Sequence, residues 1–521
     1  MYRFNKKMKA TAVIGLAVLT TGLTVWGATE HFNDSSAVTP VSSQWTSWVN
    51  DWQSVATDYT KVSLTPGCAE SEVNFAWYSK ADTAATPVVH FGTDKNNLTA
   101  YTGGAGKVDA SLTGGAAYYT NYVTVPGLQE NTTYYYTVEK SGVQSDVETY
   151  KTGSFSNVKI LYVGDPQIGA SKGQMQNGEK LVNTEGVANT AARNDGYAWN
   201  RTLEAAVRNN ADINFMISAG DQVNKTGKAK EEEYASYLSA SPLSGMPVAT
   251  TIGNHDSLNP DYSYHFNNPN PTGNGKTEAG GDYYYSYGAG LFVVLNTNNY
   301  NVAEHEATIK AAVASDPSAT WRVVTIHQDI YGSGLDHSDT DGMILRTQLT
   351  PVFDKYDIDV VLQGHDHTYS RTKILKGDGQ AHGTYEFRLA ADGADYDWDH
   401  AYNTQNDQSI TLEPAADDSA AQAVKDAFTA DNKCYTITSA NSSSVTNPDG
   451  TLYMTANSAS GSKYYELIST QQDYVANRSQ NWLPSYSIIN MTDRSFTIQT
   501  YQIKEDGKVE SIDSAFTINK N

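Results

Sequence analysis

The sequence predicts a small all-β sandwich followed by a larger α/β domain. The chain has 521 residues, which favours two or three domains rather than one compact core. Residues 52 to 153 consist of short segments with strand patterning between polar turns. From Val158 onward, apolar runs alternate with helical segments, as in a layered α/β domain.

The composition excludes some classes of protein. Hydrophobic residues make up 39% of the chain and charged residues 18%, as in a folded protein. The formal net charge of −22 argues against nonspecific nucleic-acid binding, which needs clustered lysine and arginine. So negative a protein would repel a phosphate substrate unless its active site held local positive charge. Bound metal ions are the simplest source of that charge.

The N-terminus predicts export. Basic residues among the first nine precede residues 10 to 28, which carry no charge and are rich in Val, Leu and Ala. This pattern indicates a secretion signal over 1–28, cleaved near Ala28, with an uncleaved membrane anchor as the alternative. We therefore expect a secreted protein, or one held to a membrane only by this segment. Residues 29–51 are polar and are expected to be a linker.

Residues 52–153 are expected to form the sandwich. Val73, Phe75 and Trp77 alternate with more polar neighbours, as in a half-buried strand, and a second strand covers Pro87 to Phe91. About seven short strands in this length are typical of an immunoglobulin-like or fibronectin-like sandwich. The segment holds no polar cluster with catalytic spacing.

Residues 154–521 are expected to form the α/β domain. Trp199, Leu203, Ala206 and Val207 fall on one face of a predicted helix. The apolar strand candidates are Val158–Val163, Ile213–Ile217, Pro247–Ile252, Leu291–Leu295, Arg322–Ile326 and Ile358–Leu362.

The role of residues 376–448 has two alternatives. Residues 376–448 are polar, with one short helix expected around Ala420 to Phe428, and we interpret them as an insertion that either caps the active site or lies far from it. Strand patterning returns at residues 451–456, 485–489 and 495–503.

Cys68 and Cys434 either form one disulfide or remain two free thiols.

Polar residues that can bind metals follow every strand candidate except Leu291–Leu295. Ligands gather beyond the carboxyl ends of the strands in open α/β sheets, so these side chains are expected to converge. A single Gly-Asp or His-x-His is more often a turn or a surface pair; the signal lies in the ordered set. That set is Asp165, Asp221, Asn254, His327, His365 and His367.

The donor set predicts two divalent cations. Mixed oxygen and nitrogen donors suit Zn, Mn or Fe better than Mg or Ca. Six donors for two ions require a shared ligand, and Asp221 is the best candidate to bridge. Paired ions lower the pKa of a shared water, so we expect a bridging hydroxide to attack phosphorus. His255 is the candidate that protonates the leaving oxygen or stabilises the phosphoryl oxygens.

These segments resemble the calcineurin-like metallophosphoesterase superfamily, and with the preceding sandwich they resemble its purple acid phosphatase-like branch. The resemblance covers about residues 52 to 375 and resumes near 450. It implies a central β-sandwich flanked by helices. It also implies that Asp165, Asp221 and His367 hold one metal, and that Asp221, Asn254, His327 and His365 hold the other.

Two positions depart from the family pattern. Asn224 stands where purple acid phosphatases have a tyrosine that ligates ferric iron, so the resemblance predicts a colourless enzyme. Gln167 stands where other members often have a histidine. One metal position therefore has few ligands, and Gln167 and Asn224 either complete it or hydrogen-bond to the ligands. His337 and Arg371 are candidate substrate contacts, with a solvated loop and a structural ion pair as their alternatives.

The leading functional hypothesis is a secreted acid phosphatase-like phosphomonoesterase that acts on small phosphate esters. A phosphodiesterase or nucleotidase with the same metal centre is the nearest alternative. A rival from another class is a cell-surface binding protein with a degenerate metal domain, although such a protein has no need to keep six donors.

Overall fold

The computed structural model describes residues 31–32, 43–171, 175–176, 179–180, 190–335, 337–338, 341–393, 395–441, 443–504 and 506–521. The predicted signal or anchor at 1–28 and the first part of the predicted linker lie outside these residues. Within the described part of the chain, none of the helices combines the length and the apolar character needed to cross a bilayer.

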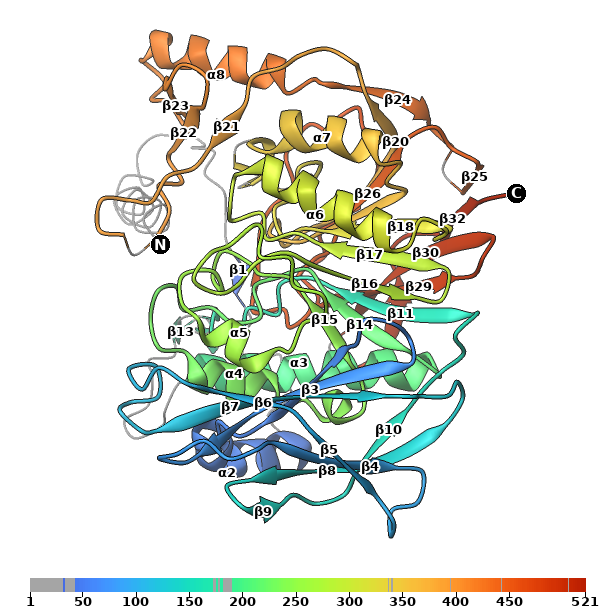
Figure 1. Ribbon diagram of the computed structural model, residues 1–521. Coiled ribbons are helices and arrows are strands. Elements are labelled where there is room, and N and C mark those ends of the chain that lie inside the picture. The colour runs from blue at the N-terminus through green and yellow to red at the C-terminus, as the bar shows by residue number, and fades with distance from the viewer. Residues whose placement is uncertain are drawn as a thin grey trace.

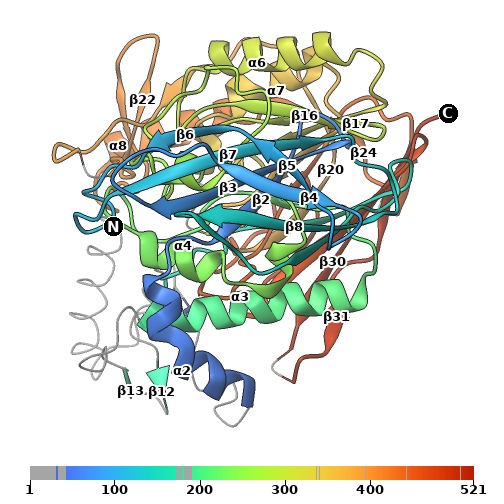
Figure 2. The same cartoon turned by 60° about the horizontal axis from the view of Figure 1, so that its bottom comes forward.

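The linker prediction is wrong for its second half, because Ser43–Thr57 form helix α2. Trp48, Trp52 and Ala56 recur at four-residue spacing and so share one face of the helix. Trp52 and Ala56 are buried in a core that belongs to the larger domain. Residues expected to link or to begin the sandwich therefore pack against the α/β domain (Figure 2).

The N-terminal domain is a β-sandwich, as predicted, and lies at the bottom of Figure 1. Val73, Phe75 and Trp77 point into its core. The opposite face of the same strand is also buried, because Asn74 and Tyr78 contact the larger domain. Its sheets are β2(Val62–Pro66), β3(Glu72–Lys80), β7(Tyr118–Pro126) and β6(Gly104–Lys107), and β10(Glu148–Lys151), β8(Thr133–Lys140), β4(Val88–Gly92) and β5(Thr99–Thr102), with β9(Val143–Gln144) beside β8.

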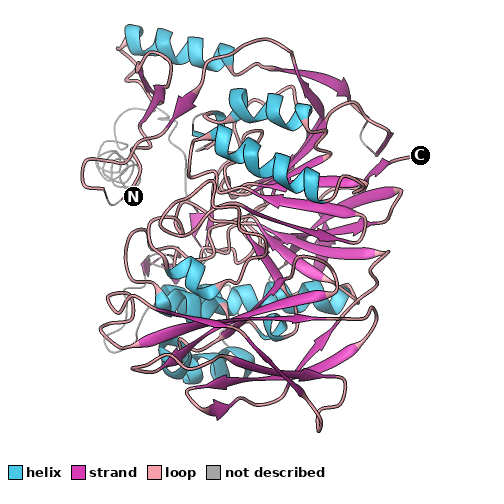
Figure 3. Ribbon diagram, in the orientation of Figure 1, coloured by secondary structure: helices cyan, strands magenta, loops and turns pink. Residues whose placement is uncertain are grey.

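The larger domain is built from two mixed eight-stranded sheets packed face to face, with helices outside both (Figure 3). One sheet contains β15(Val248–Thr250), β14(Phe215–Ser218), β11(Val158–Val163), β29(Ser485–Met491), β30(Ser495–Ile503), β32(Phe516–Asn519), β25(Ser444–Thr446) and β31(Val509–Ser511). The other contains β16(Tyr283–Tyr287), β17(Gly290–Val294), β18(Trp321–Thr325), β19(Val360–Gln363), β26(Thr451–Thr455), β20(Tyr369–Gly377), β24(Tyr435–Ser439) and β28(Val475–Ser479).

Helices cover the outer faces of both sheets. Helix α3(Thr190–Asn209), with α2 and α4(Glu231–Tyr237), packs on the first sheet, and α6(Val302–Ser315) and α7(Arg346–Lys355) pack on the second. A short α5(Asp261–His265) lies beside the sandwich. In α3, Trp199 is buried as predicted, but Val207 is 41% exposed. Successive residues of a helix point about 100° apart, so Val207 cannot share the buried face with Ala206.

The six apolar runs predicted from the sequence each overlap a strand, namely β11, β14, β15, β17, β18 and β19. Strands β11, β14 and β15 are mutually parallel, as are β17, β18, β19 and β26. Parallel strands end at the same edge of a sheet. The loops that carry the predicted donors therefore emerge on one side of the domain.

The insertion is shorter than predicted. Its helix α8(Ser419–Asp431) matches the expectation, and β21(Tyr385–Glu386), β22(His400–Asn403) and β23(Ser409–Thr411) form a small sheet beside it. However, β24 pairs with β20, and β25 pairs with β32, so the segment after α8 returns to the main sheets.

The two cysteines do not form a disulfide. Cys68 is an exposed thiol in the turn after β2, and Cys434 is a buried thiol beside the Tyr331 hydroxyl. The disulfide alternative is therefore wrong.

Candidate metal centre

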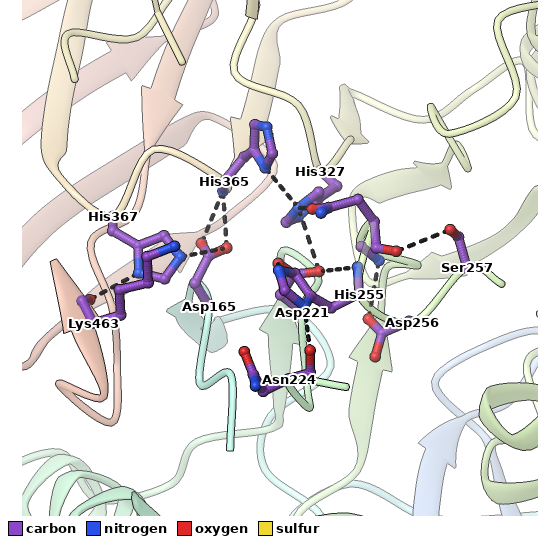
Figure 4. A network of polar contacts seen from close by, with 12 residues as sticks. Asp165, Asp221, Asn224, His255, Asp256, Ser257, His327, His365, His367 and Lys463 are labelled. Atoms are coloured by element: carbon purple, nitrogen blue, oxygen red, sulfur yellow. Dashed lines mark hydrogen bonds and ion pairs between the residues drawn. The ribbon is translucent and has the colours of Figure 1, made fainter. Parts of the chain in front are cut away.

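Five of the six predicted donors lie together at one edge of the packed sheets (Figure 4), and the sixth, Asn254, has its Oδ1 3.0 Å from the Nε2 of His327. Each follows a strand directly, and none is more than 7% exposed. Asp165 follows β11, Asp221 follows β14, Asn254 follows β15, His327 follows β18, and His365 and His367 follow β19.

Three of these donors face one another without a proton to share. The Nδ1 of His327 donates to the carbonyl of Ala219 (2.8 Å), so its Nε2 carries a lone pair. That Nε2 lies 3.0 Å from the Oδ1 of Asn254, which is also an acceptor, and 3.1 Å from the Nδ1 of His365. The Nε2 of His365 lies 3.4 Å from a carboxylate oxygen of Asp341, and the tautomer with its proton on Nε2 leaves a lone pair on Nδ1. In that tautomer three lone pairs point into one space, an arrangement that a cation resolves.

Asp221 joins this group. Its Oδ1 lies 3.5 Å from the Nε2 of His327, and one ligand atom from each of Asp221, His327 and His365 can be chosen so that all lie within 4.8 Å of one another. These side chains fit a divalent cation with mixed oxygen and nitrogen donors.

A second, smaller group lies on the other side of Asp221 (Figure 4). The Nδ1 of His367 donates to the carbonyl of Lys463 (2.8 Å), which leaves its Nε2 as a lone-pair donor. That Nε2 lies 3.6 Å from a carboxylate oxygen of Asp165. The group is poorer in ligands than the first, as the sequence predicts.

Burial makes the site unfavourable for bare charges. Desolvation raises the pKa of both Asp165 and Asp221 well above the ordinary value, and repulsion from neighbouring carboxylates, among them Asp256, raises it further. Desolvation lowers the pKa of the imidazoles of His327 and His367, and lowers that of His365 to about 4. Neutral imidazoles and paired carboxylates are the forms that bind metal, and a cation would relieve the repulsion.

Five residues of the site have a left-handed backbone. The φ values are +43° at Asp165, +37° at Gln167, +47° at Asp221, +70° at His365 and +47° at His367. Non-glycine residues pay on the order of 1–2 kcal/mol each for this conformation. Such strain persists only where the surrounding fold imposes it, and it is concentrated at functional sites.

Gln167 and Asn224 flank the poorer group. The side chain of Gln167 is buried, and its Oε1 has no hydrogen-bond partner in the described part of the structure, which is the state expected of an oxygen that awaits a cation. Asn224 is partly exposed, and its backbone carbonyl accepts from the Nδ1 of His255. Of the two side chains, Gln167 is therefore the one with a buried oxygen that a cation would satisfy.

His255 and His337 both lie beside the donors. The backbone N–H of His255 donates to Asp221 (2.9 Å), and its ring Nε2 lies 3.9 Å from the other oxygen of that carboxylate. The ring of His337 stacks on His365 with centroids 3.8 Å apart and bonds to Asp341 (2.7 Å). His337 is therefore next to the metal donors rather than on a distant solvated loop.

Arg371 forms a buried structural ion pair, which is the alternative to its predicted role as a phosphate contact. Its side chain is buried, forms an ion pair with Asp513 (2.8 Å) and stacks on Phe516. Tyr369 donates to the same carboxylate (2.6 Å). The guanidinium therefore ties β20 to the C-terminal strands, which is the structural alternative considered for it.

Two residues at the site were not found from the sequence. Asp341 contacts both His337 and His365, and Lys463 supplies the carbonyl that orients His367. Neither stands in a recognisable motif. Lys463 is 96 residues from His367, in strand β27(Lys463–Tyr464), and only the folded chain brings the two together.

Known proteins resemble this chain at two levels. Residues 158–369 match the family model described as calcineurin-like phosphoesterase, and residues 59–152 match that of the purple acid phosphatase N-terminal domain. Two uncharacterized proteins of Mycobacterium tuberculosis, MT2654 of strain CDC 1551 and Rv2577 of strain H37Rv, are 22% identical over 331 residues. The match covers 59% of this chain and 61% of each relative.

The fold has a solved counterpart. The structure of purple acid phosphatase PPD1 from yellow lupin (Lupinus luteus) seeds aligns with 89% of this chain and 74% of its own, with a TM-score of 0.55 and 15% identity. At this identity the likeness shows the fold alone. The predicted order of an all-β domain and an α/β metallophosphoesterase domain is confirmed.

Proposed function

Because this chain joins a purple acid phosphatase N-terminal domain to a calcineurin-like phosphoesterase domain, we propose that it hydrolyses phosphate esters with a pair of divalent cations. Small phosphate monoesters are the proposed substrates. The observation that carries the proposal is the set of unprotonated donors on Asn254, His327 and His365 that face one another next to Asp221.

The chain's own residues divide the work. Asn254, His327 and His365 would hold one cation, Asp165 and His367 the other, and Asp221 lies between them. Bound cations of this kind activate water and neutralise phosphoryl oxygens. The carbonyls of Ala219 and Lys463 fix the rings of His327 and His367, so that each presents the nitrogen without a proton.

His255 is the proposed proton carrier. Its Nδ1 is engaged by the carbonyl of Asn224, so Nε2 is the ring atom that faces the site. The side chain is 22% exposed, unlike the buried metal donors, so substrate can reach it. Once Nε2 has taken up a proton, the imidazolium can protonate the leaving oxygen or donate to a phosphoryl oxygen.

We also propose that the protein is exported, because residues 1–28 combine a basic start with a long uncharged apolar run. Intact-mass measurement of protein recovered from the culture medium checks this. A mature chain that begins near residue 29 agrees with a cleaved signal. Full-length protein in the membrane fraction indicates the anchor, and full-length protein in the cytosol contradicts export.

The enzymatic proposal is tested by metal analysis and by turnover of p-nitrophenyl phosphate and bis-p-nitrophenyl phosphate, with Mn, Zn and Fe supplied separately. We expect two metals per chain and faster turnover of the monoester. Asp221→Asn and His327→Ala should abolish turnover, whereas His400→Ala, on strand β22 of the insertion with its side chain 38% exposed, should not. Protein that binds no metal and hydrolyses neither ester would contradict the proposal and favour a binding protein.

A further inference from the structure

Lys463 places a positive charge beside the donors. Its backbone carbonyl holds His367, and its ammonium nitrogen lies 4.5 Å from the ring centroid of Tyr465. The edge of that ring meets His367 (5.3 Å) and His337 (4.9 Å). The side chain is partly exposed and runs alongside His367 toward Asp165 (Figure 4).

The charge of Lys463 acts on residues all round the centre. It lowers the pKa of the Asp165 and Asp221 carboxyls, and it lowers the pKa of the imidazoles of His255 and His367. These side chains come from four different loops, which follow β11, β14, β15 and β19. The effects agree with the place of the Lys463 side chain beside His367 and Asp165 in Figure 4.

Two other basic side chains near this region are buried. Lys230 is fully buried and engages the carbonyls of Lys225 (3.1 Å) and His255 (2.8 Å), with Asp261 3.7 Å away. Arg371 is held by Asp513. Lys463, by contrast, is partly exposed and lies beside His367 and Asp165 (Figure 4).

We propose that Lys463 binds a non-bridging phosphoryl oxygen of the substrate and makes the site select doubly charged terminal phosphates over singly charged diesters. This inference rests on the proposed function. A phosphate monoester dianion carries one more negative charge than a diester, so a fixed ammonium group favours it electrostatically. The proposal assigns to one side chain the monoester preference that the dinuclear centre alone does not provide.

The test compares Lys463→Met with the wild type and with Lys463→Arg. Methionine removes the charge while keeping an unbranched side chain over Tyr465, and the variant retains the backbone carbonyl that holds His367. Loss of one charge-assisted hydrogen bond should lower kcat/KM for p-nitrophenyl phosphate by roughly 10- to 100-fold. The value for bis-p-nitrophenyl phosphate should change much less, and Lys463→Arg should retain most of the monoester preference.

Binding of inorganic phosphate to the metal-loaded protein, measured by calorimetry, gives a readout independent of turnover. We expect weaker phosphate binding with unchanged metal content in Lys463→Met, and no change in Lys310→Met on the exposed face of α6. Lys463→Gln is the second variant if the methionine variant does not fold. Unchanged phosphate binding, equal losses for both esters, or loss of metal would each overturn the proposal. Failure of the wild type to hydrolyse either ester would instead sink the proposed function.

Discussion

At the residue scale, the centre depends on close packing between the backbone at Gly253 and the side chain of Asp221. Gly253 precedes Asn254 and packs directly on Asp221. A Cβ added at Gly253 would lie 2.0 Å from the Oδ1 of Asp221 and 2.2 Å from its backbone nitrogen. Neither atom can move without displacing the carboxylate that lies between the two donor groups.

We therefore predict that Gly253→Ala displaces Asp221 and lowers kcat/KM by about 100-fold, the cost of a misplacement of about 1 Å. Metal content should fall in the same variant. Gly104→Ala is the control, because an added Cβ there meets nothing within 4 Å. Wild-type metal content and turnover in Gly253→Ala would contradict the role given to Asp221.

Asp195 predicts a pH dependence of stability. Burial raises its pKa to about 7, although the amides of Gly169 (2.9 Å) and Ser171 (3.2 Å) donate to it. The folded state therefore binds more protons than the unfolded state between about pH 4 and 7. The contribution is present at low pH and is lost as pH rises through this window, by up to about 4 kcal/mol.

Urea unfolding of the metal-free protein at several pH values measures this effect. Asp195→Asn, which does not titrate, should show a shallower loss of unfolding free energy between pH 4.5 and 7.5. Identical slopes for the two proteins would show that Asp195 does not carry the dependence.

Much of the site could be predicted at this scale, because each donor directly follows a strand and loops after parallel strands converge. Lys463 and Asp341 could not be predicted. Their positions depend on contacts between loops distant in sequence, and no local pattern distinguishes them from ordinary surface residues. The two alternatives for Arg371 could not be separated, because sequence spacing does not show where a side chain on β20 points.

At the scale of elements, the sandwich is joined to the α/β domain by buried polar groups. Glu231, at the start of α4, accepts from Tyr78 of the sandwich (3.0 Å) and pairs with His265 of α5 (2.8 Å). Both Glu231 and His265 are about 2% exposed. A buried pair of this kind is costly to break because the remaining group stays unpaired.

Glu231→Ala should lower the free energy of unfolding by about 3–5 kcal/mol. Tyr78→Phe, which removes one hydrogen bond, should cost about 1–3 kcal/mol. Urea titration measures both, and metal content should stay unchanged because neither residue contacts the donors. A loss in Glu231→Ala no larger than that in Tyr78→Phe would contradict the account of this interface.

The insertion lies over the centre, which favours the capping alternative. The ring of Trp398 lies 6.0 Å from that of His365 and packs with Phe387 and Tyr396. Trp398→Ala should change KM for an aryl phosphate relative to a small alkyl phosphate by about 2- to 10-fold. Leu389→Ala, on an exposed part of the same insertion, should change the KM of neither substrate. Equal KM ratios in the wild type and Trp398→Ala would favour a decorative insertion.

The strands were predicted well because apolar runs of strand length were bounded by polar turns. Helix α2 could not be recognised from composition, because its tryptophans lie in a polar stretch of the kind that indicates a linker. Their four-residue spacing is the signal that could have predicted the helix. Strands β24 and β25 were assigned to the insertion because their residues are partly exposed and polar, and only pairing with β20 and β32 identifies them.

At the scale of the whole molecule, a chain with net charge −22 must still attract an anionic substrate. The fold meets this demand by bringing the ends of parallel strands from two sheets to one edge, where donors enclose a space suited to cations. The sandwich supplies none of these donors. Removing metal should therefore abolish activity while leaving the sandwich folded.

The most direct test is a crystal structure of the protein grown with Mn or Zn, with anomalous scattering recorded at the metal edge. The account predicts two anomalous peaks, one against Asn254, His327 and His365 and one against Asp165 and His367, with Asp221 contacting both. No peak at this edge of the sheets, or a single peak that leaves Asp221 without a contact, would contradict it.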